Sequence, residues 1–158
     1  MMLAKVIGNR TSGGSVARDF GRRVDYICRS AAVIRTRNLA GTWRDAAFQM
    51  EITAGLKPDL RTACLHIVLS WSSFETPDAD QMIAAADRIV EDLGGARYHY
   101  VVALHLGKTG HAHVVINRVH PCDGSVLSQS HDYARLELSC RRIEMANGWP
   151  PDRGRFMP

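Results

Sequence analysis

The sequence lacks the features that mark membrane and secreted proteins. No apolar run approaches the ~20 residues that a transmembrane helix needs. A secretory signal is also missing, because charged side chains interrupt the start of the chain, namely Arg10, Arg18, Asp19, Arg22 and Arg23. The four cysteines are scattered and never form Cys-x-x-Cys, which argues against a zinc ribbon and a dense disulfide framework. We therefore expect reduced thiols, no membrane insertion and a cytoplasmic location.

An internal repeat and the regular strand–helix alternation of a doubly wound sheet are missing too. The 158 residues suit one domain, long enough to bury roughly 70% of its unfolded surface. We predict a domain over residues 1–150 and a flexible tail over 151–158. Strands and helices are mixed, which favours an α+β fold with an antiparallel central sheet flanked by helices.

Hydrophobic periodicity sets the expected elements. The period of two predicts strands over 2–7, 64–71, 97–106 and 111–119. Helical spacing and capping residues predict helices over 16–27, 42–54, 76–93 and 131–147, with Gly94 and Gly148 as stops. Residues 35–42 are expected to be irregular, and the chain from Trp149 onward to be loosely ordered.

Three histidines fall within nine residues, at His105, His111 and His113. Alternation along a strand puts His111 and His113 on one face. The glycines between His105 and His111 suit a turn that brings His105 back beside them. Three neutral imidazoles on a rigid hairpin would hold a divalent cation and leave positions open for water or a phosphate oxygen. The alternative is a set of surface or hydrogen-bonded histidines.

Positive charge and one tyrosine complete the pattern. The formal charge is +4, and arginines cluster near both ends of the chain, which suits a phosphate backbone lying across the domain as well as a solvated helix face. Tyr26 lies near a predicted helix end among these arginines. Tyrosine can attack phosphorus and stay attached as an ester, although a tyrosine on an amphipathic helix can equally be a packing residue.

Motifs in a fixed order give the chain a likeness to one family. They are Met-Leu-Ala-Lys at 2–5, Tyr26-Ile27, His66-Ile-Val-Leu-Ser70-Trp71, Thr76-Pro77-Asp78, Leu93-Gly94, Val-Val-Ala-Leu-His105 and His111-Ala-His113-Val-Val-Ile-Asn117-Arg-Val-His120-Pro121. In these the sequence resembles the conjugative relaxases, plasmid-mobilisation nucleases of the HUH endonuclease superfamily, particularly the IncP-plasmid type. The last motif is the most specific.

The resemblance implies a relaxase-like palm that nicks and rejoins one DNA strand at an origin of transfer. It implies Tyr26 as nucleophile, forming a tyrosine–5′-phosphate intermediate, and His105, His111 and His113 as ligands of Mg²⁺ or Mn²⁺. The DNA-contacting residues would be Ser70, Arg22, Arg23, Arg29, Arg35, Arg37 and Asn117. The implied partners are single-stranded origin DNA, accessory relaxosome proteins and a coupling protein, in the bacterial cytoplasm.

The chain departs from the family pattern at Gly107, where relatives carry an acidic residue, and the loop to His111 is one residue shorter. Loss of this carboxylate would remove a group that orients a histidine or helps deprotonate the tyrosine. Asp19, Asp25 and Asp45 are the candidate substitutes. The alternatives are therefore an accessory DNA-binding protein with weak or no cleavage, a replication or transposition nuclease, and a metallo-hydrolase of small phosphoesters. Relatives extend further, so the chain is a truncated product, an excised domain or a small relative.

Overall fold

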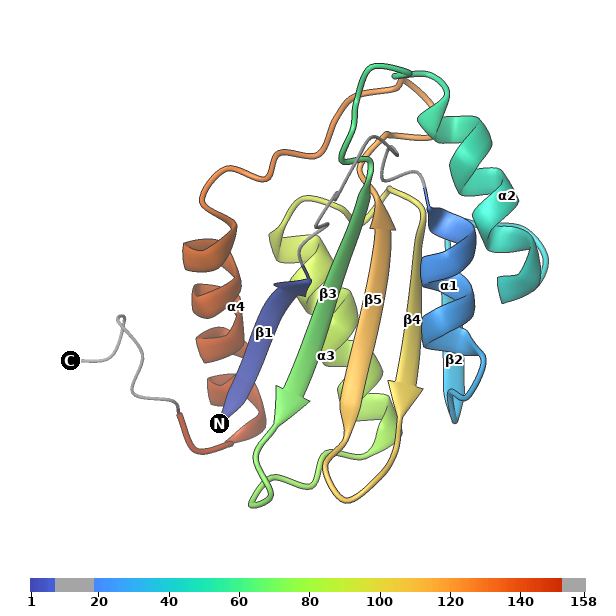
Figure 1. Cartoon of the computed structure of the whole chain (residues 1–158). Helices are drawn as coiled ribbons and strands as arrows, with labels where there is room; N and C mark the ends of the chain where they lie inside the picture. Colours follow the sequence, from blue (N-terminus) through green and yellow to red (C-terminus); the bar gives the residue numbers. More distant parts are fainter. Residues whose placement is uncertain (8–18, 152–158) are drawn as a thin grey trace.

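The computed structural model describes residues 1–7 and 19–151, which form one antiparallel sheet with helices on both faces (Figure 1). The strands are β1 (Met2–Ile7), β2 (Val33–Arg37), β3 (Cys64–Trp71), β4 (Tyr100–His105) and β5 (His111–Asn117). The helices are α1 (Phe20–Cys28), α2 (Trp43–Ala54), α3 (Ala79–Asp92) and α4 (Asp132–Asn147). The strand order is β1-β3-β5-β4-β2, with every pair antiparallel. The predicted α+β class is confirmed.

Each face of the sheet has its own hydrophobic core. Even-numbered residues of β4 and β5, such as Leu104 and Ile116, pack with α3 and α4. Odd-numbered residues, such as Val101 and Val115, pack with α1 and α2. This division follows from the alternation of side chains along a strand. Figure 1 shows α1 and α2 near the β2 edge and α4 near the β1 edge.

The helix boundaries follow local signals in the sequence. Thr42 caps α2 in a capping box with Asp45, and Asp78 caps α3 in a capping box with Gln81. Helix α3 therefore begins after Asp78, slightly later than the predicted start at Thr76. Gly94 and Gly148 follow α3 and α4 with φ values of 88° and 66°, the left-handed conformation that glycine adopts at helix ends.

Two predictions for the backbone are wrong. Residues 35–42 were predicted to be irregular, but residues 35–37 belong to strand β2 (33–37), which pairs with β4. The alternation of apolar residues that marks a strand is interrupted here by Arg35 and Arg37. Both occupy positions on the α3 side of the sheet, where Asp87 neutralises Arg37. Trp149 is also more ordered than predicted, since its ring packs edge-on against Trp71 at 6.3 Å between centroids. Val16 and most of the predicted tail 151–158 lie outside the described residues.

The cysteines are free thiols, as expected. Burial raises the pKa values of Cys28, Cys64 and Cys140 to about 12, so these thiols stay protonated core residues. Across residues 1–7 and 19–151, no helix combines the length and apolar character needed to cross a bilayer.

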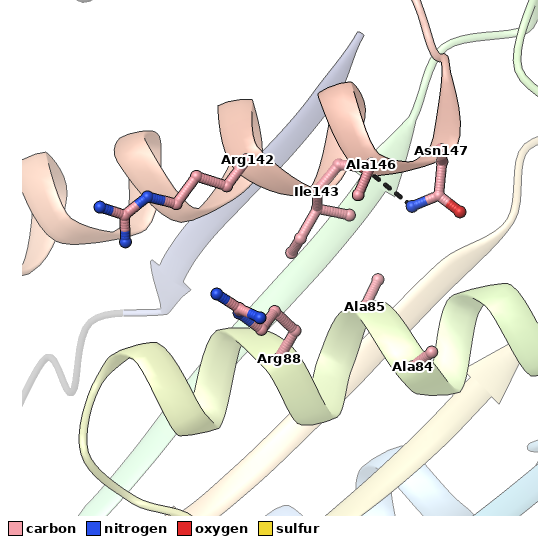
Figure 2. A pocket seen from close by; sticks show the side chains of 7 residues that line it. All are labelled: Ala84, Ala85, Arg88, Arg142, Ile143, Ala146 and Asn147. Carbon is pink, nitrogen blue, oxygen red and sulfur yellow. Dashed lines mark hydrogen bonds between the residues drawn. The ribbon is translucent and has the colours of Figure 1, made fainter.

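A cavity of about 370 Å³ lies between α3 and α4, on the face of the sheet away from α1 and α2 (Figure 2). Its lining consists mostly of small and apolar side chains, with Arg88 and Arg142 toward one end and Asn147 toward the other. Arg88 is paired with Asp92 at 2.9 Å. None of the residues that the sequence singled out for chemistry lines this cavity.

Candidate active site

The three histidines share one face of the sheet at the turn end of the β4–β5 hairpin. His105 and His111 are directly paired across the hairpin, and His113 lies opposite Ala103. Since Ala103 belongs to the core beneath α1 and α2, all three rings project toward that side. The ring centroids of His105 and His113 are 4.8 Å apart. The hairpin prediction is confirmed.

Hydrogen bonds to backbone carbonyls fix the tautomers of two of these rings. His105 donates from Nε2 to the carbonyl of Ile27 at 2.7 Å, and His111 donates from Nδ1 to the carbonyl of Thr109 at 2.9 Å. A ring nitrogen that donates to a carbonyl carries the hydrogen, so the lone pairs lie on Nδ1 of His105 and Nε2 of His111. Metal-binding histidines are typically oriented by such carbonyl contacts. The donor chemistry of these two residues therefore fits a divalent cation.

A fourth imidazole joins the cluster from β3. The Nε2 atom of His66 lies 3.0 Å from Nδ1 of His113, and an Arg23 guanidinium nitrogen lies 3.2 Å from Nδ1 of His66. Burial lowers the pKa of His66 to about 4, helped by repulsion from His113 and Arg23. Burial also lowers the pKa of His113 to about 4, with added repulsion from His105 and His111. Both rings are therefore neutral near pH 7, the form that accepts hydrogen bonds or binds a metal.

Sequence reasoning left His66 outside the cluster. The signal that could have found it is the alternation of β3, which puts His66 on the same face as Ser70. Its partner His113 lies 47 positions away, and only the β3–β5 pairing brings the two together.

In the structure, the ring orientations of the histidines are not those of a metal-coordinating group. Among residues 1–7 and 19–151, no set of three or more His, Cys, Asp or Glu side chains is arranged to hold a metal ion. The backbone brings the right ligand types to one face, while hydrogen bonds to Ile27, Thr109 and His66 set the ring orientations. The structure thus shows a hydrogen-bonded histidine cluster.

Tyr26 lies beside this cluster in the last turn of α1. Its side chain is 67% exposed, and its ring meets that of His113 edge-on, with 6.3 Å between centroids. The neighbouring Ile27 is fully buried and receives the His105 hydrogen bond through its carbonyl. The buried side of α1 therefore fixes the helix on the sheet and presents the phenol to solvent next to His113.

The arginines divide between the two faces. Arg22 and Arg23 lie on α1 with Tyr26, and Arg29 follows the helix as its C-cap; Arg22 is paired with Asp19 and Arg29 with Asp25. Arg35 and Arg37 are opposite Val102 and Tyr100 and so face α3. Arg37 also makes two hydrogen bonds to Asp87, at 3.2 and 2.9 Å. The structure therefore does not bring Arg35 and Arg37 to Tyr26, because the edge strand β2 points them to the other side of the sheet.

Of the two predicted polar contacts to DNA, Ser70 lies on the histidine face of the sheet, whereas Asn117 is buried. Ser70 pairs with His111 on the histidine face and is partly exposed, as its predicted contact with DNA requires. Asn117 is fully buried, donates to the carbonyl of Met50 at 3.0 Å and accepts from the amide of Val119 at 3.1 Å. The structure therefore places the Asn117 side chain inside the fold, where its amide joins β5 to α2, and not on the histidine surface. Lys5, which sequence reasoning missed, is exposed on the histidine face opposite Val68.

The carboxylates considered as substitutes for the missing acid are engaged elsewhere. Asp19 caps α1 and pairs with Arg22, Asp25 pairs with Arg29, and Asp45 accepts from the backbone N–H of Thr42 in the capping box of α2. At Gly107 a Cβ atom would meet no heavy atom within 4 Å. The position where relatives carry the acid is therefore open to a side chain.

Comparison with known sequences gives a consistent result. The family model "Relaxase: MobA/VirD2-like, nuclease domain" matches residues 26–149. MobA of Acidithiobacillus ferrooxidans is 33% identical over 95 residues, which are 58% of this chain and 23% of MobA. A TraI protein of Escherichia coli is 26% identical over 160 residues, covering 96% of this chain and 21% of TraI. The chain thus spans about a fifth of the length of these relatives.

Solved structures agree on the fold. Two Mn-bound crystal structures of the MobM relaxase domain (MOBV; Mob_Pre) with plasmid pMV158 oriT DNA give TM-scores of 0.60 and 0.62. In both, the match covers 98% of this chain and 90% of the MobM chain at 15% identity, which establishes likeness of fold alone. The family match extends over most of the chain and includes Tyr26 and the three histidines. The chain therefore belongs to the relaxase family with the MobA/VirD2-like nuclease domain.

Proposed function

We propose that this domain nicks and rejoins one DNA strand at an origin of transfer, and so starts the transfer of a conjugative plasmid or mobile element. The observation that carries the proposal is the exposed phenol of Tyr26 beside His113, on the face that also carries His105 and His111. Membership of the relaxase family supports it. The MobM relaxase domain bound to plasmid oriT DNA supports origin DNA as the substrate.

The proposed reaction is a transesterification. The Tyr26 oxygen attacks the scissile phosphorus, a tyrosine–phosphorus bond forms, and the bond from phosphorus to the 3′ oxygen breaks. The phenolic proton leaves to solvent, to which Tyr26 is open, and the released strand takes up a proton as its 3′-hydroxyl. The 5′ end stays on Tyr26, and attack by a 3′-hydroxyl reverses the step. Joining needs no further energy source, because the ester is retained.

The surrounding residues would bind and orient the reactants. His105, His111 and His113 would hold Mg²⁺ or Mn²⁺, which when bound supplies positive charge at the phosphate. The carbonyls of Ile27 and Thr109 would keep two of these rings oriented. The DNA backbone would be contacted by residues on α1, at its C-cap or on the histidine face of the sheet, namely Arg22, Arg23, Arg29, Ser70 and Lys5.

The direct test is incubation with Mn²⁺ and labelled single-stranded oligonucleotides that tile the DNA element encoding the chain. We expect one sequence to give a protein–DNA adduct that survives a denaturing gel. Binding to one sequence with no adduct in Mn²⁺ or Mg²⁺ would favour an accessory DNA-binding protein. That rival is supported by Gly107 and by the engagement of Asp19 and Asp25 with arginines.

Removing one proposed ligand should remove metal binding. His113→Ala is expected to lower Mn²⁺ affinity by more than the ~10–100-fold that loss of an outer partner costs, as measured by calorimetry. His131→Asn is the matched control, because His131 is exposed, lies far along the chain at the start of α4, and has φ of 58°, which asparagine tolerates. Equal Mn²⁺ affinity in both variants would contradict the three-histidine assignment.

The affinity for DNA should depend on salt through Arg22, Arg23 and Arg29. Each phosphate contact on a single strand contributes about 0.7 to the slope of log K against log salt, so three contacts give a slope near −2. Arg22→Ala should make the slope shallower by about 0.7. Arg35→Ala should leave it unchanged, because Arg35 is exposed on the opposite side of the sheet. A slope of zero in the wild type would argue for a protein partner.

A further inference from the structure

We propose that Arg23, acting through His66, determines which nitrogen of His113 carries its hydrogen, and thereby couples metal binding at the histidines to phosphate binding by Arg23. Arg23 and His66 would then be positioning residues for the site. The inference rests on the proposed function for its metal and DNA partners. Its core, the tautomer of His113, concerns this chain alone.

The direction of each hydrogen bond follows from the donors. A guanidinium only donates, so Nδ1 of His66, 3.2 Å from an Arg23 nitrogen, must accept. The hydrogen of the neutral His66 ring is then on Nε2, which donates over 3.0 Å to Nδ1 of His113. Nδ1 of His113 therefore accepts, and its hydrogen lies on Nε2. Both nitrogens of His113 are occupied in this arrangement, so the ring has no lone pair left for a metal.

Loss of the hydrogen bond from Arg23 would allow the hydrogen bond between His66 and His113 to change direction. Without the guanidinium, His66 is free to carry its hydrogen on Nδ1 and to accept at Nε2 from His113. The Nε2 atom of His113 then has a free lone pair, like Nε2 of His111 and Nδ1 of His105. Three lone pairs on one face are what a cation requires. The four histidines can therefore adopt two arrangements, one in which His113 cannot bind a metal and one in which it can. The two differ only in which ring nitrogen carries the hydrogen on His66 and on His113.

A DNA phosphate bound beside Tyr26 would draw the Arg23 guanidinium away from His66. Arg23 lies on α1 three residues before Tyr26, so the two side chains are neighbours on the helix surface. The Arg23 side chain is partly exposed. A phosphate held next to Tyr26 would therefore compete with His66 for the guanidinium. Linkage then requires that DNA raise metal affinity and that metal raise DNA affinity by the same factor.

The tautomers are measurable directly by NMR of protein with ¹⁵N-labelled histidine at pH 7 without metal. In the wild type we expect hydrogens on Nε2 of both His66 and His113. In Arg23→Met the His113 hydrogen should move to Nδ1 in a large share of molecules, while Arg22→Met should leave the spectrum as in the wild type. Nδ1–H on His113 in the wild type, or identical spectra for Arg23→Met and wild type, would overturn the proposal.

Calorimetry with Mn²⁺ alone tests the coupling. Arg23→Met should bind Mn²⁺ on the order of 10-fold more tightly than wild type, which is the size of effect seen when a residue that hydrogen-bonds to a metal ligand is changed. Arg22→Met removes the same charge one residue away and should change the affinity much less. Equal gains in both variants would show simple charge repulsion and overturn the coupling. Absence of an adduct in the nicking assay, with these tautomer shifts present, would instead count against the proposed function alone.

Discussion

Replacing Tyr26 by phenylalanine is expected to abolish the covalent DNA adduct while fold and single-strand binding stay as in the wild type. The change removes only the hydroxyl that would attack phosphorus. The ring remains to meet His113, and the exposed position makes no demand on the core. The adduct should fall below detection on a denaturing gel, while the affinity for labelled single-stranded DNA changes less than twofold, within the ~0.5 kcal/mol typical of surface substitutions.

Tyr133→Phe is the matched control for this experiment. Tyr133 lies in α4, on the other face of the sheet, and its side chain is 72% exposed, close to the 67% of Tyr26. It should form the adduct at the wild-type level. An adduct that persists in Tyr26→Phe would show that another residue is the nucleophile.

Restoring a carboxylate at position 107 should accelerate nicking. A Gly107→Asp side chain meets no heavy atom within 4 Å at its Cβ, so the fold should accept it. If the new carboxylate orients a histidine or takes the phenolic proton, the rate should rise by up to the ~10²–10⁴ typical of acid–base assistance. The gain should be largest near neutral pH, where acid–base assistance by a side chain is most effective. Single-turnover nicking with Mn²⁺ measures it.

Gly107→Asn separates charge from shape, since it adds a side chain of the same size without the carboxylate. It should remain at the wild-type rate. A second variant that combines the aspartate with one inserted loop residue tests whether the shorter loop misdirects the new group. If every variant matches a fast wild type, another residue already performs the task. If all bind DNA without cutting in Mn²⁺, the accessory-protein function becomes the better one.

Much of the fold was determined by local signals. Alternation fixed β1 and β3, and the glycines between the histidines fixed the β4–β5 hairpin, so His105, His111 and His113 could be assigned to one face in advance. Capping residues placed α2 and α3 to within a few positions. Such features depend on neighbours within a turn or one strand pair, which the sequence shows directly.

Tertiary structure alone decided which distant residues meet. His66 contacts His113 because β3 pairs with β5, and Tyr26 reaches the same ring because α1 packs over β4 and β5. Contacts of this kind depend on strand order, which local patterns do not encode.

The same limit explains why the structure places some of the predicted site residues away from Tyr26 and the histidines. Arg35 and Arg37 are close to Tyr26 in sequence, yet the side-chain alternation of β2 puts them on the opposite face of the sheet, where Arg37 pairs with Asp87 of α3. Asn117 belongs to the most specific motif, yet its side-chain amide bonds to backbone groups of Met50 in α2 and of Val119, just after β5. The sequence by itself determined the chemical groups and the hairpin that carries them. Strand pairing and helix packing decided which groups share a site, because only they join residues far apart in the chain.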